Sequence, residues 1–313
     1  MHGWQYHTSN AREQYVLQQH ILPASDASRR AMLLSQSGPS AGRWLTAMPT
    51  SAGTTLEPIR MQVALRRRLW WPLPAGGGRC VGRSCQSRLD VLGDHMASCH
   101  LSGRLSRRAK PLERTWARVF REAGGRVSEN VFLRDTTLHR IRPTDGRRLE
   151  IVATGLPLHR GAPLGCDATM VSPLHADGTP WRRADTEAGI AIQRGEACKA
   201  RTYPELVESS QLRLLTLAVE TGGRWSTTCA TTVRQLAAAK ARSVPTHLRK
   251  TARVAYASRW WALLSVAAQN TLAATVYGDA VGVLDGIDDV EPTTVDVCYE
   301  ASLAPPVSRL PAR

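Results

Sequence analysis

The chain has 313 residues with 41 Lys+Arg and 26 Asp+Glu, a formal net charge of +15, and 42% hydrophobic residues. This apolar content excludes a wholly disordered chain, and the length allows about two domains. No apolar run approaches the ~18 residues of a membrane span, and the opening residues MHGWQYHTSN contain no secretory signal. We therefore expect a protein that is neither secreted nor transmembrane and that binds a polyanion.

The positive charge is concentrated between Arg60 and Arg148. This segment holds 20 Lys+Arg and seven Asp+Glu, a net +13, and Lys110 is its only lysine. Because the planar guanidinium suits phosphate, the segment favours nucleic acid over a membrane surface. An arginine-rich composition of the whole chain is the alternative, but it does not explain the scarcity of acidic residues here. The predicted nucleic-acid-binding residues are Arg66, Arg67, Arg68, Arg83, Arg104, Arg107 and Arg108.

The first part of the chain predicts little regular structure. Residues 1–74 are rich in small and polar residues, and we expect them to be loosely ordered apart from a short basic helix from Glu57 to Trp70. The segment PLPAGGG at 72–78 then interrupts the chain. A convincing amphipathic helix begins at Pro111, which is tolerated at a first helical position, and ends at Gly124.

The rest of the chain predicts an α/β fold. Four segments read as strands: 126–133, 147–154, 164–172 and 213–220. Helices are expected at about 186–208, 227–242 and 246–277. This order predicts a mixed sheet flanked by helices over 111–243, preceded by a small module at 75–110. A separate C-terminal helix at 244–277 and a disordered tail at 278–313 would follow.

Three cysteines and a histidine form the pattern C-x4-C-x9-H-x3-C, at Cys80, Cys85, His95 and Cys99. Four nitrogen and sulfur ligands at short spacings around a turn are what tetrahedral zinc requires. Because all four positions are filled by protein, the predicted zinc is structural, with no open position for chemistry. The adjacent His100 is a possible substitute for His95, with poorer geometry.

Two carboxylates lie inside apolar strands, Glu150 in RRLEIVATG and Asp167 in LGCDATMVSP. On neighbouring strands such side chains can converge and hold a divalent cation such as Mg²⁺, which supports phosphodiester hydrolysis. Lys199 is a candidate for orienting water or neutralising the phosphate. An edge or solvent-facing position is the ordinary alternative for an acidic residue in a strand.

Residues 75–240 resemble a known family through five short segments taken together: LGDHMASC, RRLEIVATG, CDATMVSP, KARTYPEL and GGRWS. The chain resembles the C-terminal region of site-specific non-LTR retrotransposon proteins, which carry a zinc-binding cluster and a restriction-like endonuclease of the PD-(D/E)XK class. No aromatic-x-Asp-Asp word of the family's reverse transcriptase occurs in a strand context. We therefore expect the chain to represent only part of such a protein.

The resemblance implies a restriction-endonuclease-like fold and a role for each site residue. Glu150 and Asp167 would bind a catalytic Mg²⁺, Lys199 would be the catalytic lysine displaced onto the following helix, and Tyr203 would support the site. Glu113 would be an accessory acid. The expected partner is double-stranded DNA and the expected location is the nucleus. The alternative function is that of a catalytically inactive, zinc-containing nucleic-acid-binding remnant.

Overall fold

A computed structural model describes residues 4–74, 77–138, 141–207, 209–277 and 291–303. The first part forms α1 (Trp4–Val16), the π-helical turn η1 (Leu17–Ile21), α2 (Ala27–Ser35), the 3-10 turns η2 (Arg43–Thr46) and η3 (Ala52–Thr54), and α3 (Pro58–Arg68). Short helices follow: α4 (Asp94–Ser98), η4 (His100–Ser102) and α5 (Leu105–Arg108). The predicted basic helix is therefore present as α3.

The central part has the predicted α/β order. It consists of α6 (Lys110–Glu122), β1 (Arg126–Phe132), η5 (Leu133–Asp135), β2 (Arg148–Thr154), η6 (His159–Gly161), β3 (Leu164–Val171), α7 (Ile190–Thr202), α8 (Pro204–Val207) and β4 (Arg213–Glu220). The sheet has the order β1-β2-β3-β4, in which only β3 and β4 are parallel. A four-stranded mixed sheet flanked by helices is thus confirmed.

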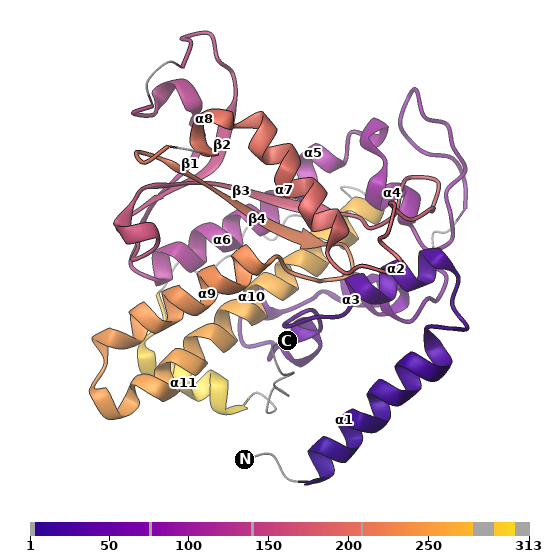
Figure 1. The fold of residues 1–313 in the computed structure, drawn as a ribbon, viewed down its shortest axis with the longest axis horizontal. Helices are drawn as coiled ribbons and strands as arrows, with labels where there is room; N and C mark the ends of the chain where they lie inside the picture. The colour runs from indigo at the N-terminus through magenta and orange to yellow at the C-terminus, as the bar shows by residue number, and fades with distance from the viewer. Residues whose placement is uncertain (1–3, 75–76, 139–140, 208, 278–290, 304–313) are drawn as a thin grey trace.

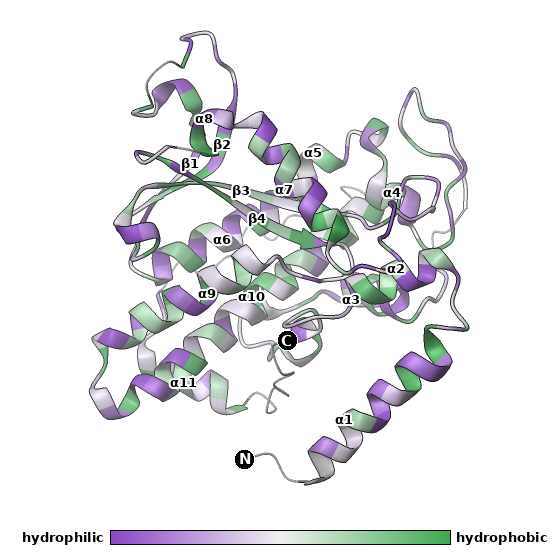
Figure 2. Cartoon of the chain, viewed as in Figure 1, coloured by the Kyte–Doolittle hydropathy of each residue, from purple (hydrophilic) through white to green (hydrophobic). Residues whose placement is uncertain are grey.

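Helices cover both faces of this sheet. The last part contributes α9 (Thr227–Lys240), η7 (Ala241–Ser243), η8 (Thr246–Leu248), α10 (Arg249–Tyr277) and α11 (Thr294–Leu303). In Figure 1, α6, α9 and α10 lie on one side of the strands, and α7 and α8 lie on the other. Figure 2 shows hydrophobic positions along β3 and β4, between these two layers.

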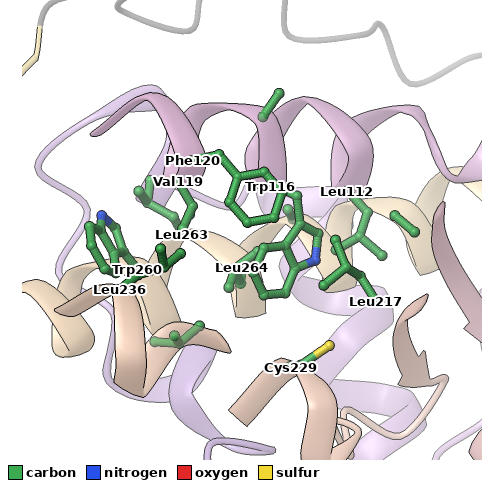
Figure 3. Close-up of a cluster of buried hydrophobic side chains, with 14 of the residues drawn as sticks. Leu112, Trp116, Val119, Phe120, Leu217, Cys229, Leu236, Trp260, Leu263 and Leu264 are labelled. Atoms are coloured by element: carbon green, nitrogen blue, oxygen red, sulfur yellow. The ribbon is translucent and has the colours of Figure 1, made fainter. Parts of the chain in front are cut away.

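The main core lies between the sheet and the layer of α6, α9 and α10. Trp116 and Phe120 of α6 are fully buried, and Figure 3 shows them facing Leu263 and Leu264 of α10. The i, i+4, i+8 spacing of Leu112, Trp116 and Phe120 places them on one stripe of α6. The 29-residue α10 is therefore a central core element instead of the separate C-terminal helix expected from the sequence.

The N-terminal region is more ordered than the sequence predicted. Ser35, at the end of α2, accepts a hydrogen bond from the Gly222 amide on Oγ at 3.0 Å, and its carbonyl accepts one from the Arg224 amide at 2.9 Å. A Cβ at Gly222 would lie 2.6 Å from the Ser35 backbone, so only glycine allows this approach. Sequence reasoning missed this contact because its partners lie almost 190 residues apart.

The expectation of a disordered tail is also corrected in part. Among residues 278–313 the structure describes 291–303, and these contain α11, which packs against α10. Arg259 donates to Glu300 at 2.6 Å, and the hydroxyls of Tyr256 and Thr294 are 2.9 Å apart. The remaining predicted tail, 278–290 and 304–313, lies outside the described residues. Val297 is fully buried, so α11 contributes to the core instead of extending into solvent.

Candidate metal centre and carboxylate site

The four predicted zinc ligands come together in the structure. The ligand atoms of Cys80, Cys85, His95 and Cys99 all lie within 4.8 Å of one another. The sulfur of Cys99 is 3.9 Å from that of Cys80 and 3.7 Å from that of Cys85, and Cys85 Sγ is 3.4 Å from His95 Nε2. Zinc–sulfur bonds of about 2.3 Å in a tetrahedron put sulfurs about 3.8 Å apart. The cluster could therefore hold a metal ion and is compatible with zinc.

Local backbone structure explains how the first two ligands meet. Cys80 lies beside the bridge between Arg79 and Arg88, and the Gly82 amide donates to its sulfur at 3.4 Å. A Cβ at Gly82 would lie 2.5 Å from the carbonyl oxygen of Leu101, so the turn requires glycine. The wide C-x4-C spacing is thus accommodated by a tight turn between two short extended segments.

The second pair of ligands is fixed by α4. Asp90 accepts backbone hydrogen bonds from Leu92, Asp94 and His95 at 2.7–3.0 Å, which satisfies the free amides at the start of this helix. Cys99 then follows at its C-terminal end. Sequence reasoning missed Asp90, although its position before a helix that carries a ligand was a signal for a capping role.

The His95 ring is oriented by a distant loop. Its Nδ1 lies 2.8 Å from the carbonyl oxygen of Ala176, so Nδ1 carries the proton and Nε2 is free to bind metal. Ser98 also donates to the carbonyl of Leu174 at 3.1 Å. The cluster is therefore attached to the segment that follows β3. His100, the alternative ligand, is exposed and does not belong to the cluster.

The thiols of the cluster differ in acidity. Hydrogen bonds from Ser87 lower the pKa of the Cys85 thiol to about 6, whereas burial raises the pKa of the Cys99 thiol to about 11. Metal binding requires thiolates, so a cation would have to displace the proton of Cys99. The cluster is thus built for a thiophilic metal that competes strongly with protons.

We expect Cys80→Ala to lose the metal. The protein should be purified with about one zinc per chain, and the variant should retain less than about a tenth of that amount, since three ligands leave the tetrahedron open. Metal analysis of both proteins checks this result. Cys198→Ala is the matched control, because Cys198 is an exposed thiol outside the cluster. An equal zinc content in all three proteins would remove the assignment.

The predicted carboxylates meet where the sheet opens. β2 and β3 pair only from Ile151 to Ala153, opposite Cys166 to Leu164. At the next position the pairing stops, and Glu150 Oε2 accepts the Ala168 amide at 2.5 Å in place of a backbone carbonyl. This side-chain bond keeps the Ala168 amide satisfied while the strands separate. The gap places Glu150 beside Asp167.

Lys199 of α7 completes this group. Its Nζ lies 2.7 Å from Oδ1 and 2.8 Å from Oδ2 of Asp167, which is only 2% exposed. Tyr203 is one turn further along, and its hydroxyl donates to the carbonyl of Arg148 at 2.7 Å. Because the phenol has a single proton and donates it to this carbonyl, the charged partner of Asp167 is Lys199. Tyr203 therefore fixes the start of β2.

The site holds more negative than positive charge. Burial, followed by the charges of Asp167 and Glu113, raises the pKa of Glu150 to about 8. Burial also raises the pKa of Asp167, although Lys199 opposes this shift. Glu113 of α6 is buried and accepts a hydrogen bond from Lys110 at 3.0 Å. Three carboxyl groups thus face two lysines, and a bound cation would favour the ionised form of Glu150, which its raised pKa leaves mostly protonated at neutral pH.

Most of the predicted nucleic-acid-binding arginines have partners within the protein. Arg67 is buried, donates to Asp94 at 2.8 Å and also donates to the Leu92 carbonyl. Arg108 donates to the carbonyls of Ala97 and Met170, and burial lowers its pKa to about 10. These two arginines attach residues 77–110, which carry the Cys/His cluster and are the candidate metal-binding module, to α3 and β3. Their contacts favour a structural role over phosphate binding.

The remaining predicted arginines differ in exposure. Arg104 donates to the carbonyls of Thr275 and Val276 at 3.2 Å, and Arg66 donates to that of Pro72 at 2.5 Å. Arg68 is half-buried and Arg83 is exposed, whereas the side chain of Arg107 lies outside the described residues. Buried carbonyls at the ends of short helices require such donors. Part of the charge concentration therefore serves the fold.

No family model and no curated protein matches the chain. Among the described helices, none combines the length and apolar character needed to cross a bilayer. The function must therefore be argued from the two sites themselves.

Proposed function

We propose that this chain is a metal-dependent DNA endonuclease with a PD-(D/E)XK restriction-like fold, derived from a site-specific non-LTR retrotransposon protein. One observation carries the proposal: Glu150, Asp167 and Lys199, which lie on β2, β3 and α7, meet where the two strands separate. Glu113 of α6, the expected accessory acid, contributes its charge to the same group. Such an enzyme would act on chromosomal DNA in the nucleus.

The carboxylate group suits Mg²⁺. The ion prefers oxygen ligands and takes few carboxylates together with water and phosphate. Asp167 Oδ1 is a buried oxygen paired with the Lys199 ammonium at 2.7 Å, and the pKa of Glu150 is raised by burial and by neighbouring negative charge. These two carboxylates would hold the ion. When bound, Mg²⁺ would supply Lewis-acid activation of water and neutralise charge on a phosphodiester.

The other residues have roles that follow from their contacts. Lys199 holds the Asp167 carboxylate in one orientation, and its 27% exposed side chain presents a positive charge to an arriving phosphate. Tyr203 fixes the β2 backbone at Arg148, two residues before Glu150. The Glu150–Ala168 hydrogen bond links β2 to β3 beyond their last paired residues and holds the Glu150 carboxyl group beside Asp167.

Nicking of supercoiled plasmid tests this proposal. Zinc-loaded protein should convert supercoiled to open-circular DNA with Mg²⁺ and should leave it intact with Ca²⁺ alone, because Ca²⁺ accepts looser geometry and activates water poorly. Conversion should be absent without a divalent cation. A chain that binds plasmid but never nicks it would support the inactive remnant and contradict the endonuclease.

A further inference from the structure

A groove of about 1020 Å³ lies between α7 and the metal-binding module. The end of β3 and the residues that follow it, from Met170 to Ser172, line one part of the groove. α7 lines a second part, and α4, η4 and α5 line the third. The groove therefore begins beyond the point where β2 leaves β3 and extends toward the Cys/His cluster.

The groove and the carboxylate site lie along the same strand and the same helix. Val171 and Asp167 lie on the same face of β3, four residues and about 13 Å apart. α7 runs back along this strand, so that Lys199 contacts Asp167 while Gly195 lies against Val171, where a Cβ would come within 2.9 Å. The groove and the carboxylate site are therefore built on the same two elements, β3 and α7.

Among the described residues that line the groove, all the ionisable side chains of Arg and His are basic and none is acidic. Arg194 and Arg201 are exposed on α7, His100 is exposed on the opposite wall, and no carboxylate belongs to the lining. In the described part of the chain neither Arg194 nor Arg201 forms an ion pair, unlike Arg67, which pairs with Asp94. Their guanidinium groups are available for an anion.

Arg194 is held in place by an aromatic stack. Its guanidinium carbon lies 3.9 Å from the ring centroid of Trp181, and this ring lies 3.4 Å from that of His175. The Trp181 indole is fixed by donating to the carbonyl of Ser172 at 3.1 Å. A guanidinium already held against an aromatic ring loses less conformational entropy when it binds a phosphate. The other face of the planar guanidinium can also stack on a base.

The apolar character of the lining favours a single strand over a duplex. Leu105, Met170 and Leu174 line the groove together with Trp181. A duplex presents phosphates outward and leaves such a surface unused, whereas a single strand offers unstacked bases to apolar and aromatic groups. The groove thus combines the two features of single-strand sites, which are cations along a path and surfaces for bases.

We infer that this groove binds a single-stranded segment of nucleic acid that continues from the carboxylate site toward the Cys/His cluster. The inference rests on the proposed function for its direction, since the strand would lead to or from the phosphate at Lys199. Binding in the groove does not itself require catalysis. The phosphates would contact Arg194 and Arg201, and the bases would face the apolar part of the lining.

Fluorescence anisotropy with a labelled oligodeoxythymidine tests the inference on the full chain, without added Mg²⁺. The variant Arg194→Ala/Arg201→Ala should weaken binding about tenfold or more at low salt. The slope of log affinity against log salt should fall by about 1.4, since each phosphate contact to a single strand contributes about 0.7. Both side chains are exposed, so the melting temperature should not change.

The matched control is Arg234→Ala/Arg242→Ala, which removes the same charge from exposed positions of α9 and η7, outside the groove. It should weaken binding less than about twofold. Equal losses in both variants, or no loss in the groove variant, would overturn the inference. A loss of duplex affinity as large as the loss of single-strand affinity would also overturn it, because the groove would then be a general phosphate surface.

The two proposals fail in different ways. A chain that shows the groove-dependent single-strand affinity but never nicks plasmid refutes the endonuclease and leaves the groove. A chain that nicks plasmid with Mg²⁺, and whose groove variant binds single strands as tightly as the parent, refutes the groove and leaves the endonuclease.

Discussion

Asp167→Asn is expected to lower Mg²⁺-dependent nicking by about 10³-fold or more. Asparagine keeps the size of the side chain but removes the negative charge that would hold the metal and Lys199, and losses of this order follow removal of a central electrostatic group. The nicking rate at saturating Mg²⁺ measures the effect. Residual activity at the parental rate would show that cleavage occurs elsewhere or comes from a contaminant.

The same substitution should leave the fold intact or stabilise it. Burial raises the pKa of Asp167, so a neutral amide costs less to bury than the carboxylate. Lys199 is part exposed and can reach water when its partner is lost. The matched control is Glu129→Gln, which removes an exposed carboxylate from β1 and should change neither nicking nor stability measurably. Loss of activity together with unfolding would contradict the assigned role.

Glu122→Gln is expected to destabilise the protein by about 3 kcal/mol or more at pH 7. Glu122, at the end of α6, is buried and accepts hydrogen bonds from Arg259 at 3.2 Å, Arg118 at 3.0 Å and the Trp260 indole at 2.8 Å. The substitution leaves the buried guanidinium of Arg259 with only Glu300 as a charged partner. Urea denaturation of both proteins at equal protein concentration measures the difference.

The effect of Glu122→Gln should depend on pH. Burial acts to raise the pKa of Glu122, but the hydrogen bond and charge of Arg259 outweigh it and lower that pKa below its ordinary value of 4.5. The carboxylate therefore stabilises the fold above about pH 4.5, and this contribution disappears as the pH falls through the depressed pKa. The difference in the free energy of unfolding between the parent and the variant should therefore become smaller in acid. The control Glu291→Gln, at an exposed ion pair, should show a change below about 1 kcal/mol at either pH.

Elements with strong local patterns were predicted well from the sequence. β4 has the expected bounds, 213–220, and β1, β2 and β3 differ from the expected segments by one residue at one end. The Cys/His cluster was also predicted, because four ligands within twenty residues leave few alternative arrangements. The predicted helix 186–208 is instead α7 and α8, since Pro204 cannot continue a helix whose amide bonds it would interrupt.

Features that depend on distant partners were not predictable from local pattern. Arg67, which the sequence predicted to bind nucleic acid at the surface, is buried and paired with Asp94. The His95 ring is oriented by the carbonyl of Ala176, 81 residues away. The convergence of Glu150 and Asp167 was expected from neighbouring strands, but the separation of those strands was not. Composition alone cannot distinguish an arginine that binds a carbonyl from one that binds a phosphate.

The position of α10 determines which pieces of this protein can exist independently. It contacts α3 and η2 from the N-terminal part, α4 and α5 from the metal-binding module, and α6, α9 and α11. A fragment covering only 111–243 would lack Trp260, Leu263 and Leu264 and would expose the apolar surface of α6 to water. Any shorter version that is to be expressed and assayed must therefore keep both α10 and α11, whose Val297 lies in the same core, and so extend through Leu303.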